Sequence, residues 1–186
     1  MRHFTQADYR RRPWKNGGGE TLELAIFPHG ADLDDFAWRI SMATIDRDGP
    51  FSRFEGIDRA IMVQRGAGMA LNFGGSVSTL RAGDAPYHFD GGRSTACRLL
   101  AGPVTDFNIM SRRSLCSNDV TAIGANTTVS GSDATYVLAT AAVSFDAFPH
   151  GLAQTDLVAI ERGESLTIVA GHALAIRFKF REPEHV

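Results

Sequence analysis

"WKNGGGETLELAIF" (residues 14–27) joins three consecutive glycines to a segment with a period of two. In this segment one set of alternate residues is Glu20, Leu22, Leu24 and Ile26, and the other is Thr21, Glu23, Ala25 and Phe27. A phosphate-binding loop would place its lysine after the glycines and continue into a helix, whereas Lys15 precedes them here. Alternation with a period of two is typical of a β-strand. The glycines therefore introduce a strand, where they permit unusual backbone angles and the close approach of another group. A structural turn that binds nothing is the alternative for a glycine run taken alone.

The rest of the chain repeats this strand character. Short alternating segments are separated by glycine, proline, aspartate or asparagine, and no segment has the pattern of an amphipathic helix. The segments are residues 37–45 (AWRISMATI), 60–66, 69–73, 94–102, 135–145, 155–163 and 172–180. Many short strands with turn signals at this spacing predict an all-β sandwich or barrel.

A faint internal repeat bears on the number of barrels. Gly83-Asp84-Ala85, followed after five residues by Gly91, recurs 80 positions later as Gly163-Glu164-Ser165 followed by Gly171. Coincidence is the alternative in a chain with 19 glycines. Taken as real, the repeat predicts two similar β-barrels in tandem, divided within the polar segment that follows residue 110.

Composition excludes several classes of function. The chain has 186 residues and a net charge of −2, so bulk electrostatics give no case for nucleic-acid binding. No stretch approaches the length of a membrane span, and no apolar leader predicts export. Cys97 and Cys116 make no disulfide framework and lack zinc spacing, so we expect a cytoplasmic protein.

Strand alternation also groups the candidate binding residues. In residues 38–45, Arg39, Ser41 and Ala43 share one face, and an arginine beside small residues suits a small carboxylate if that face points inward. If this face points into water instead, Arg39 is an ordinary surface arginine and indicates no binding site. Two further polar faces are expected, one with Thr21, Glu23 and Ala25 and one with Asp106 and Asn108. If these faces converge, Glu23 or Asp106 would orient Arg39, because a buried arginine needs such a partner.

Metal and nucleophilic chemistry have weak support. The six histidines are scattered, with no H-x-H or H-E-x-x-H spacing, and there is no G-x-S-x-G. We therefore expect no metal and no cofactor, and the sequence identifies no catalytic residue.

Five motifs in order, "WKNGGGETLELA", "WRISMA", "DGPFSRFEGIDR", "FDGG" and "DFNIM", resemble the HutD/Ves family of bicupin proteins. The match is strong over residues 10–113 and general beyond them. The resemblance implies two tandem cupin-type (RmlC-like) barrels, over residues 1–113 with the ligand pocket and 114–186 without one. The boundary is approximate, and an exchange of the first strands between barrels stays open. Metal-binding cupins carry histidines in their first motif, whereas residues 50–66 contain none.

The resemblance also implies a function and a set of site residues. It indicates a metal-independent regulator of histidine utilisation that binds a small carboxylate such as urocanate or formylglutamate. The alternatives are a metal-independent isomerase or hydrolase, with Glu23 or Asp106 as general base, and a protein-interaction module; whether the chain forms a homodimer stays open. The implied ligand-binding residues are Lys15, Asn16, Thr21, Glu23, Arg39, Ser41, Phe51, Ser52, Asp58, Arg59, Asp106 and Asn108.

Overall fold

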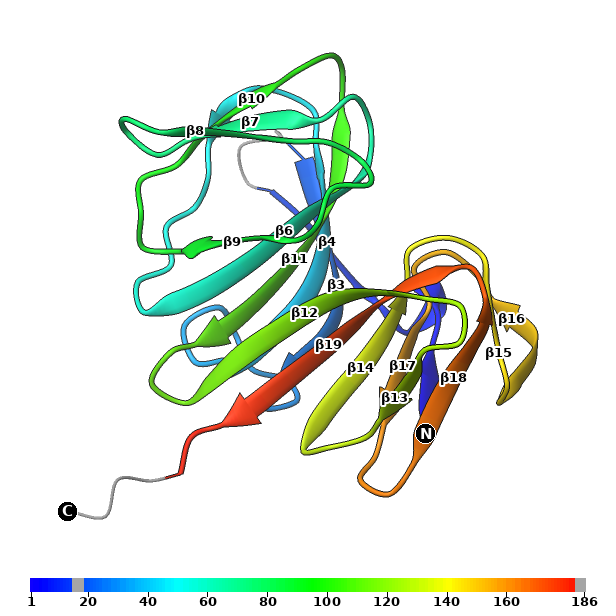
Figure 1. Ribbon diagram of the computed structural model, residues 1–186. Coiled ribbons are helices and arrows are strands. Elements are labelled where there is room, and N and C mark those ends of the chain that lie inside the picture. Colours follow the sequence, from blue (N-terminus) through cyan, green and yellow to red (C-terminus); the bar gives the residue numbers. More distant parts are fainter. Residues whose placement is uncertain (15–18, 183–186) are drawn as a thin grey trace. The chain divides into compact units, whose positions relative to one another are not determined.

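The computed structural model describes residues 1–14 and 19–182, and nearly all regular elements in this part of the chain are β-strands (Figure 1). A short 3-10 turn, η1 (Gln6–Asp8), lies near the N-terminus. The chain divides into an N-terminal unit, residues 10–115, and a C-terminal unit, residues 1–9 with those from Cys116 onward. The expected division after residue 113 thus differs by two residues, and the first nine residues belong to the C-terminal unit.

Two antiparallel sheets form the N-terminal unit. The first has the order β2 (Arg10–Pro13), β3 (Gly19–Phe27), β4 (Trp38–Ile45), β11 (Val104–Arg112), β6 (Ile57–Arg65) and β9 (Tyr87–Asp90). The second has the order β5 (Gly49–Pro50), β10 (Ala96–Leu99), β7 (Met69–Asn72) and β8 (Val77–Leu80). Apolar side chains from both sheets pack in one cluster that includes Ile45, Ile61, Leu71 and Cys97. The two sheets therefore enclose a common interior, as in a cupin-type barrel.

The register of β4 decides which of its faces points inward. Ile45 packs in the interior cluster, and Arg39, Ser41 and Ala43 lie on the same face of the strand. Arg39 is 5% exposed and Ser41 1% exposed, so the interpretation in which this face meets water is wrong. The interior of the barrel thus contains a buried arginine beside two small side chains.

A β-bulge corrects one expected face of β3. Thr21 pairs with Ala43 and Glu23 with Ser41, but the register shifts after Glu23, so that Ala25 pairs with Ile40. A bulge inserts one extra residue, which moves every later side chain to the opposite face. Thr21 and Glu23 therefore share the inward face as expected, and Ala25 does not.

The end of the glycine run has a steric role. Gly19 adopts a φ of +154°, and a Cβ atom there would lie 2.1 Å from the carbonyl oxygen of Thr44. The Trp14 backbone N–H also donates to the Gly19 carbonyl at 3.0 Å. Gly19 thus allows the backbones of β3 and β4 to approach closely, while residues 15–18, including Lys15 and Asn16, lie outside the described part of the chain.

The C-terminal unit is a second barrel with an apolar core. Its five-stranded sheet has the order β1 (Arg2–Phe4), β17 (Leu157–Ile160), β14 (Ala134–Ala139), β19 (His172–Phe180) and β12 (Cys116–Gly124). Its four-stranded sheet has the order β13 (Thr128–Ser130), β18 (Ser165–Ala170), β15 (Val143–Phe145) and β16 (Phe148–Leu152). Valine, leucine, isoleucine, alanine and phenylalanine from both sheets make up the core cluster.

The N-terminal segment is attached to this second barrel. β1 pairs with β17 from Arg2 to Phe4. His3 Nε2 lies 3.0 Å from Asp156 Oδ2, and the Tyr9 hydroxyl donates to the Thr155 carbonyl at 2.7 Å. The first nine residues thus complete the sheet of the C-terminal unit.

The 80-residue repeat corresponds to one turn that occurs in both units. The Arg81 backbone N–H donates to the Asp84 carboxylate at 2.7 Å, and the Glu161 backbone N–H donates to the Glu164 carboxylate at 2.9 Å. The glycine before each acid has a positive φ, +92° at Gly83 and +87° at Gly163. The same local structure, 80 residues apart, shows that this part of the repeat is structural.

Candidate functional site

Three neighbouring strands bring the candidate residues together in rows across the barrel interior. On β11, Met110 lies between Arg39 of β4 and Arg59 of β6. The next inward residue, Asn108, lies between Ser41 and Ile61, and then Asp106 lies between Ala43 and Val63. Directly opposed residues in an antiparallel sheet point to the same face. Arg39 and Arg59 therefore lie on either side of Met110, and Asp106 lies two rows, or four residues of β11, away from them.

Glu23 and Arg39 form a buried ion pair. Arg39 Nε donates to Glu23 Oε2 at 2.8 Å, and both side chains are 6% exposed. Arg12 Nη2 lies 3.9 Å from the other oxygen of Glu23. Of the two acids expected to orient Arg39, Glu23 makes the contact, and its carboxylate largely neutralises the charge of Arg39.

Arg59 is buried with weaker polar partners. Its Nε donates to Asn108 Oδ1 and its Nη1 to the Ser52 carbonyl, both at 3.4 Å, which is longer than a typical hydrogen bond. Its guanidinium carbon lies 4.9 to 5.7 Å from the ring centroids of Phe51, Phe54 and Phe89. Rings at this distance attract a cation without removing its charge.

Burial lowers the pKa of Arg59 to about 10, and the charge of Arg39 contributes to the lowering, while Asp106 opposes it. The guanidinium is therefore still positive at neutral pH. No carboxylate among the described residues forms a hydrogen bond with it.

Asp106 is the second unusual group in the interior. It is 1% exposed, and its Oδ1 has no hydrogen-bond partner among the described residues. Burial raises the pKa of Asp106 to about 7, although the positive charge of Arg59 and a hydrogen bond with the Ala43 backbone oppose the rise. An unpartnered carboxylate oxygen in such a place is costly, so it marks a position where a hydrogen-bond donor would be stabilising.

The other predicted residues divide between the interior and the surface. Thr21 accepts a hydrogen bond from Trp14 Nε1 at 2.8 Å, and Ser41 Oγ donates to the Asn108 carbonyl at 3.3 Å. Ser52 is exposed, and it is its backbone carbonyl that accepts the hydrogen bond from Arg59. Asp58 points outward, where Arg113 donates to its carboxylate at 2.7 and 2.9 Å. Ser52 and Asp58 therefore do not present their side chains to the interior.

Sequence reasoning missed three residues that shape the environment of Arg59. Phe54 and Phe89 pack against its guanidinium together with the predicted Phe51. A Cβ atom on Gly91 would lie 3.0 Å from Arg59 Cδ and 2.9 Å from a backbone oxygen. The motif "FDGG" contains both Phe89 and Gly91, so the sequence did mark these two residues. Their contact with Arg59 could not be predicted, because it depends on the pairing of β9 with β6.

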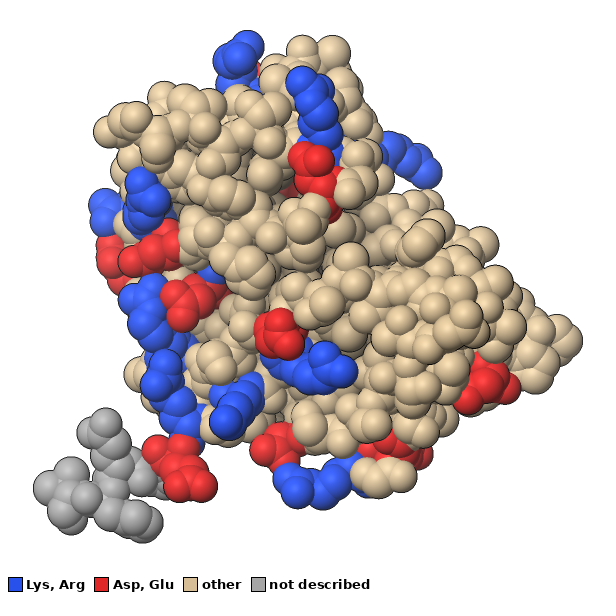
Figure 2. Space-filling model, in the orientation of Figure 1, with Lys and Arg blue, Asp and Glu red and all other residues tan. Residues whose placement is uncertain are grey.

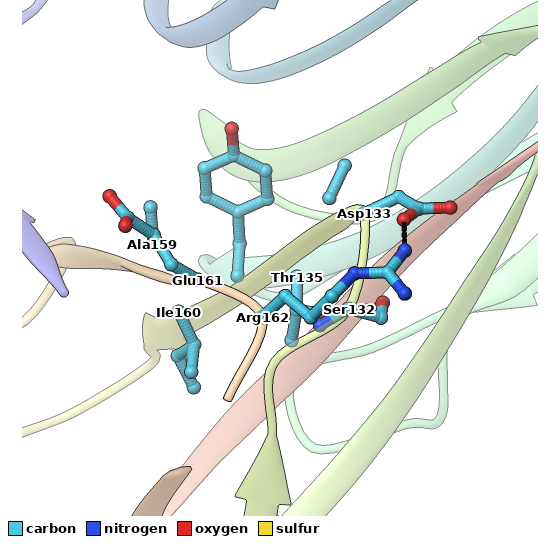
Figure 3. Close-up of a pocket in the computed structure, with 9 residues that line it drawn as sticks. Ser132, Asp133, Thr135, Ala159, Ile160, Glu161 and Arg162 are labelled. Atoms are coloured by element: carbon cyan, nitrogen blue, oxygen red, sulfur yellow. Dashed lines mark hydrogen bonds and ion pairs between the residues drawn. The ribbon is translucent and has the colours of Figure 1, made fainter. Parts of the chain in front are cut away.

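A pocket of about 410 Å³ lies in the C-terminal unit (Figure 3). Strands β14 and β17 and the turns beside them form it, and Arg162 and Asp133 bond to each other at its edge. The buried hydroxyl of Thr135 already bonds to Ser132 at 2.8 Å. Because four of its polar side chains bond to one another in pairs, this pocket offers a weaker case for a binding site than the interior of the N-terminal barrel.

Two further features bear on the classes of ligand. Among residues 1–14 and 19–182, no three histidine, cysteine, aspartate or glutamate side chains are grouped to hold a metal ion. The same residues contain no helix long and apolar enough to cross a bilayer. On the face shown in Figure 2, acidic and basic side chains lie beside one another.

These observations define a bicupin with a polar interior in its first barrel, and comparison with known proteins gives the family. The HutD family model matches residues 6–177, and the chain belongs to this family. A Pseudomonas putida protein described as an uncharacterized 21.2 kDa protein in the hutC 3' region is 43% identical over 103 residues, 55% of this chain and 54% of the relative. Protein Ves of Escherichia fergusonii is 36% identical over 61% of this chain and 60% of the relative. These matches thus span little more than half the length of the curated relatives.

Solved structures match over nearly the whole chain. HutD from Pseudomonas fluorescens SBW25 superposes with a TM-score of 0.86 at 29% identity, covering 97% of this chain and 99% of that one. A conserved protein of unknown function, PA5104 from Pseudomonas aeruginosa, has a TM-score of 0.82 at 30% identity and covers 96% and 98%. A cupin barrel protein from Leptotrichia buccalis has a TM-score of 0.59 at 9% identity over 86% and 88%, a likeness of fold alone. The predicted all-β cupin fold is confirmed.

Proposed function

We propose that this chain is a metal-independent regulator of histidine utilisation in the cytoplasm, and that it binds a small carboxylate such as urocanate or formylglutamate inside its N-terminal barrel. The link to histidine utilisation rests on membership of the HutD family and on a relative located in a hutC 3' region. The binding role rests on the chemistry of the barrel interior.

One observation carries the proposal: Arg59 is a buried cation whose recorded hydrogen bonds are long and go to neutral oxygens. A guanidinium forms its strongest contacts with carboxylates, which match its planar fork of donors. Arg39 already has such a partner in Glu23. Arg59 is therefore the better candidate for the main anion-binding group, because Glu23 largely neutralises the charge of Arg39.

Titration calorimetry with urocanate and with N-formylglutamate tests the proposal. Arg59→Met keeps a flexible apolar side chain that packs well against aromatic rings but removes the charge and all donors. We expect the affinity for the bound acid to fall about ten- to a hundredfold, because hydrogen bonds to charged groups are strong. Arg59→Lys keeps the positive charge but loses the planar pair of donors, so its affinity for the acid should lie between those of the wild type and Arg59→Met.

Arg113→Met is the matched control. Arg113 is an exposed arginine of the same unit that bonds to Asp58 and Asp90. Its replacement should leave ligand affinity unchanged. Unchanged affinity in a folded Arg59→Met protein, or no binding of either acid to the wild type, would contradict the proposal.

One observation also supports a second candidate, a metal-independent isomerase or hydrolase. Burial raises the pKa of Asp106 to about 7, and a general base works best with a pKa near the working pH. Incubation of each acid with the protein, followed by chromatography, separates the two functions. Product formation that is lost in Asp106→Asn would favour the enzyme, whereas binding without product would favour the regulator.

A further inference from the structure

Asp106 also bears on which acids the interior can accept. Its unpartnered Oδ1 lies on the same inward face as the two arginines, two rows further along β11. Four residues of a strand span about 13 Å between Cα atoms. Arg59 shortens this distance, because its Nε reaches Asn108 Oδ1 in the intervening row. The separation between its guanidinium and Asp106 is therefore on the scale of a small molecule.

On β4 the residues beside these two groups are small, whereas Ile61 of β6 shares the row of Asn108. Ser41 and Ala43 occupy β4 beside the rows of Asn108 and Asp106, and Thr21 faces the Ala43 row from β3. Beyond Asp106 the face becomes apolar, with Ile45 and Val104 in the interior cluster. The polar part of the interior thus has a positive end at Arg59 and an acceptor end at Asp106.

We infer that the ligand of this site has two different ends: a carboxylate that pairs with Arg59 and an N–H or O–H group that donates to Asp106 Oδ1. This inference rests on the proposed function, since it assumes that Arg59 binds the carboxylate. It makes Asp106 a specificity-determining residue, because an acid of the same shape without the donor would leave the Asp106 oxygen desolvated and unpaired. Sites built for a hydrogen bond discriminate strongly against such analogues.

The groups around Asp106 are consistent with an acceptor role. Arg59 of β6 attracts the carboxylate, and Arg39 of β4 acts on Arg59. The Cys97 thiol of β10 also faces Asp106 and stays neutral, because burial, followed by the charge of Asp106, raises its pKa to about 12. Glu23 of β3 is bonded to Arg39. Among the described residues, no donor that faces Asp106 from these elements satisfies its Oδ1.

Matched pairs of acids test the inference. Urocanate and 3-(2-furyl)acrylate share the acrylate and a five-membered ring, but the furan has no N–H. Pyrrole-2-carboxylate and furan-2-carboxylate form a shorter pair that differs in the ring N–H alone, whereas furylacrylate also lacks the second ring nitrogen of urocanate. For the pair that binds at pH 7.5, calorimetry should show the N–H acid binding about ten- to a hundredfold more tightly to the wild type.

Two variants assign the preference to Asp106. Asp106→Val removes the acceptor beside Ala43 and Val63, and the preference should fall to less than about threefold. Asp106→Asn keeps one acceptor without the charge, and it should show an intermediate preference if Asp106→Val does not fold.

The outcomes separate this inference from the proposed function. Equal binding of both members of a pair, sensitive to Arg59→Met, would overturn the inference and leave the proposed function intact; an ordered water would then satisfy Asp106. A preference that persists in Asp106→Val would also overturn the inference. Failure of all four acids and of N-formylglutamate to bind would overturn both.

Discussion

Replacing Asp106 with asparagine should change how the free energy of unfolding depends on pH. Burial raises the pKa of Asp106 from the ordinary 3.8 to about 7, so between these values the folded chain holds a proton that the unfolded chain has lost. Stability from this group is present below pH 3.8 and is lost as the pH rises toward 7. An asparagine side chain has no such proton to lose, and the variant avoids the penalty.

The size of the effect follows from the shift. Each pKa unit corresponds to about 1.4 kcal/mol, so the raised pKa costs about 4 kcal/mol of stability at pH 8, where the folded carboxyl is ionised, and about 2 kcal/mol at pH 5, where it still holds its proton. The stability of Asp106→Asn relative to the wild type should therefore rise by about 2–3 kcal/mol from pH 5 to pH 8. The asparagine also loses the attraction of the carboxylate to Arg59, which reduces the stability gained by Asp106→Asn at each pH.

Urea denaturation of both proteins at pH 5, 6, 7 and 8 measures this difference. Asp90→Asn is the control in the same unit, because the Gly92 backbone N–H and Arg113 lower the pKa of that exposed carboxyl. Its stability relative to the wild type should be slightly negative and nearly constant from pH 5 to pH 8, because the lowered pKa of Asp90 lies below this range and its contribution is lost only as the pH falls through that pKa. If the Asp106→Asn difference is the same at every pH, Asp106 has an ordinary pKa and its oxygen is satisfied.

Two further predictions concern the supports of the site. Arg39→Met should destabilise the chain by about 3–5 kcal/mol, because it removes the hydrogen-bonded partner of the buried Glu23 and leaves only Arg12 at 3.9 Å. Adding Glu23→Gln should recover most of the loss in urea denaturation; equal stability of the single and double variants would contradict this. Gly19→Ala should lower the melting temperature markedly because its Cβ would lie 2.1 Å from the Thr44 carbonyl oxygen, whereas Gly49→Ala, with open space around it, should not; similar melting temperatures would exclude the close approach.

The inward faces were predictable from sequence wherever strands alternate without interruption. The pattern grouped Arg39 with Ser41, and Asp106 with Asn108, as the structure does. It failed for Ala25, because a bulge reverses the alternation and the bulge depends on pairing with β4. Asp58 and Arg59 are neighbours in one strand, so they point to opposite faces and alternation alone excludes one of them from the interior.

Charge pairing was less accessible to sequence reasoning. Arg39 and Arg59 look equivalent as inward arginines, yet Arg39 bonds to Glu23 and Arg59 lies among three phenylalanine rings. The difference arises from the register of β3 against β4 and from the position of the loop around Phe51 and Phe54, whose backbone N–H groups donate to the carbonyls of Thr95 and Gly91. Glu23 and Phe89 contact arginines on other strands, and Phe51 and Phe54 reach Arg59 from the loop before β6, so the alternation within one strand encodes none of these contacts.

The two barrels allow the polar interior to be judged within one chain. Among the described residues of the C-terminal barrel, the one buried charged side chain is Asp156, which accepts a hydrogen bond from the Ala153 backbone N–H and contacts His3 of the N-terminal segment. This barrel therefore closes without a buried arginine among its described residues. The N-terminal barrel buries Glu23, Arg39, Arg59 and Asp106, each less than 7% exposed. Burying charges rarely adds stability compared with apolar residues of similar volume. The four charged groups are therefore better explained by a requirement of binding than by a requirement of folding. The unpartnered oxygen of Asp106 supports the same explanation, because a ligand could supply its missing hydrogen-bond donor.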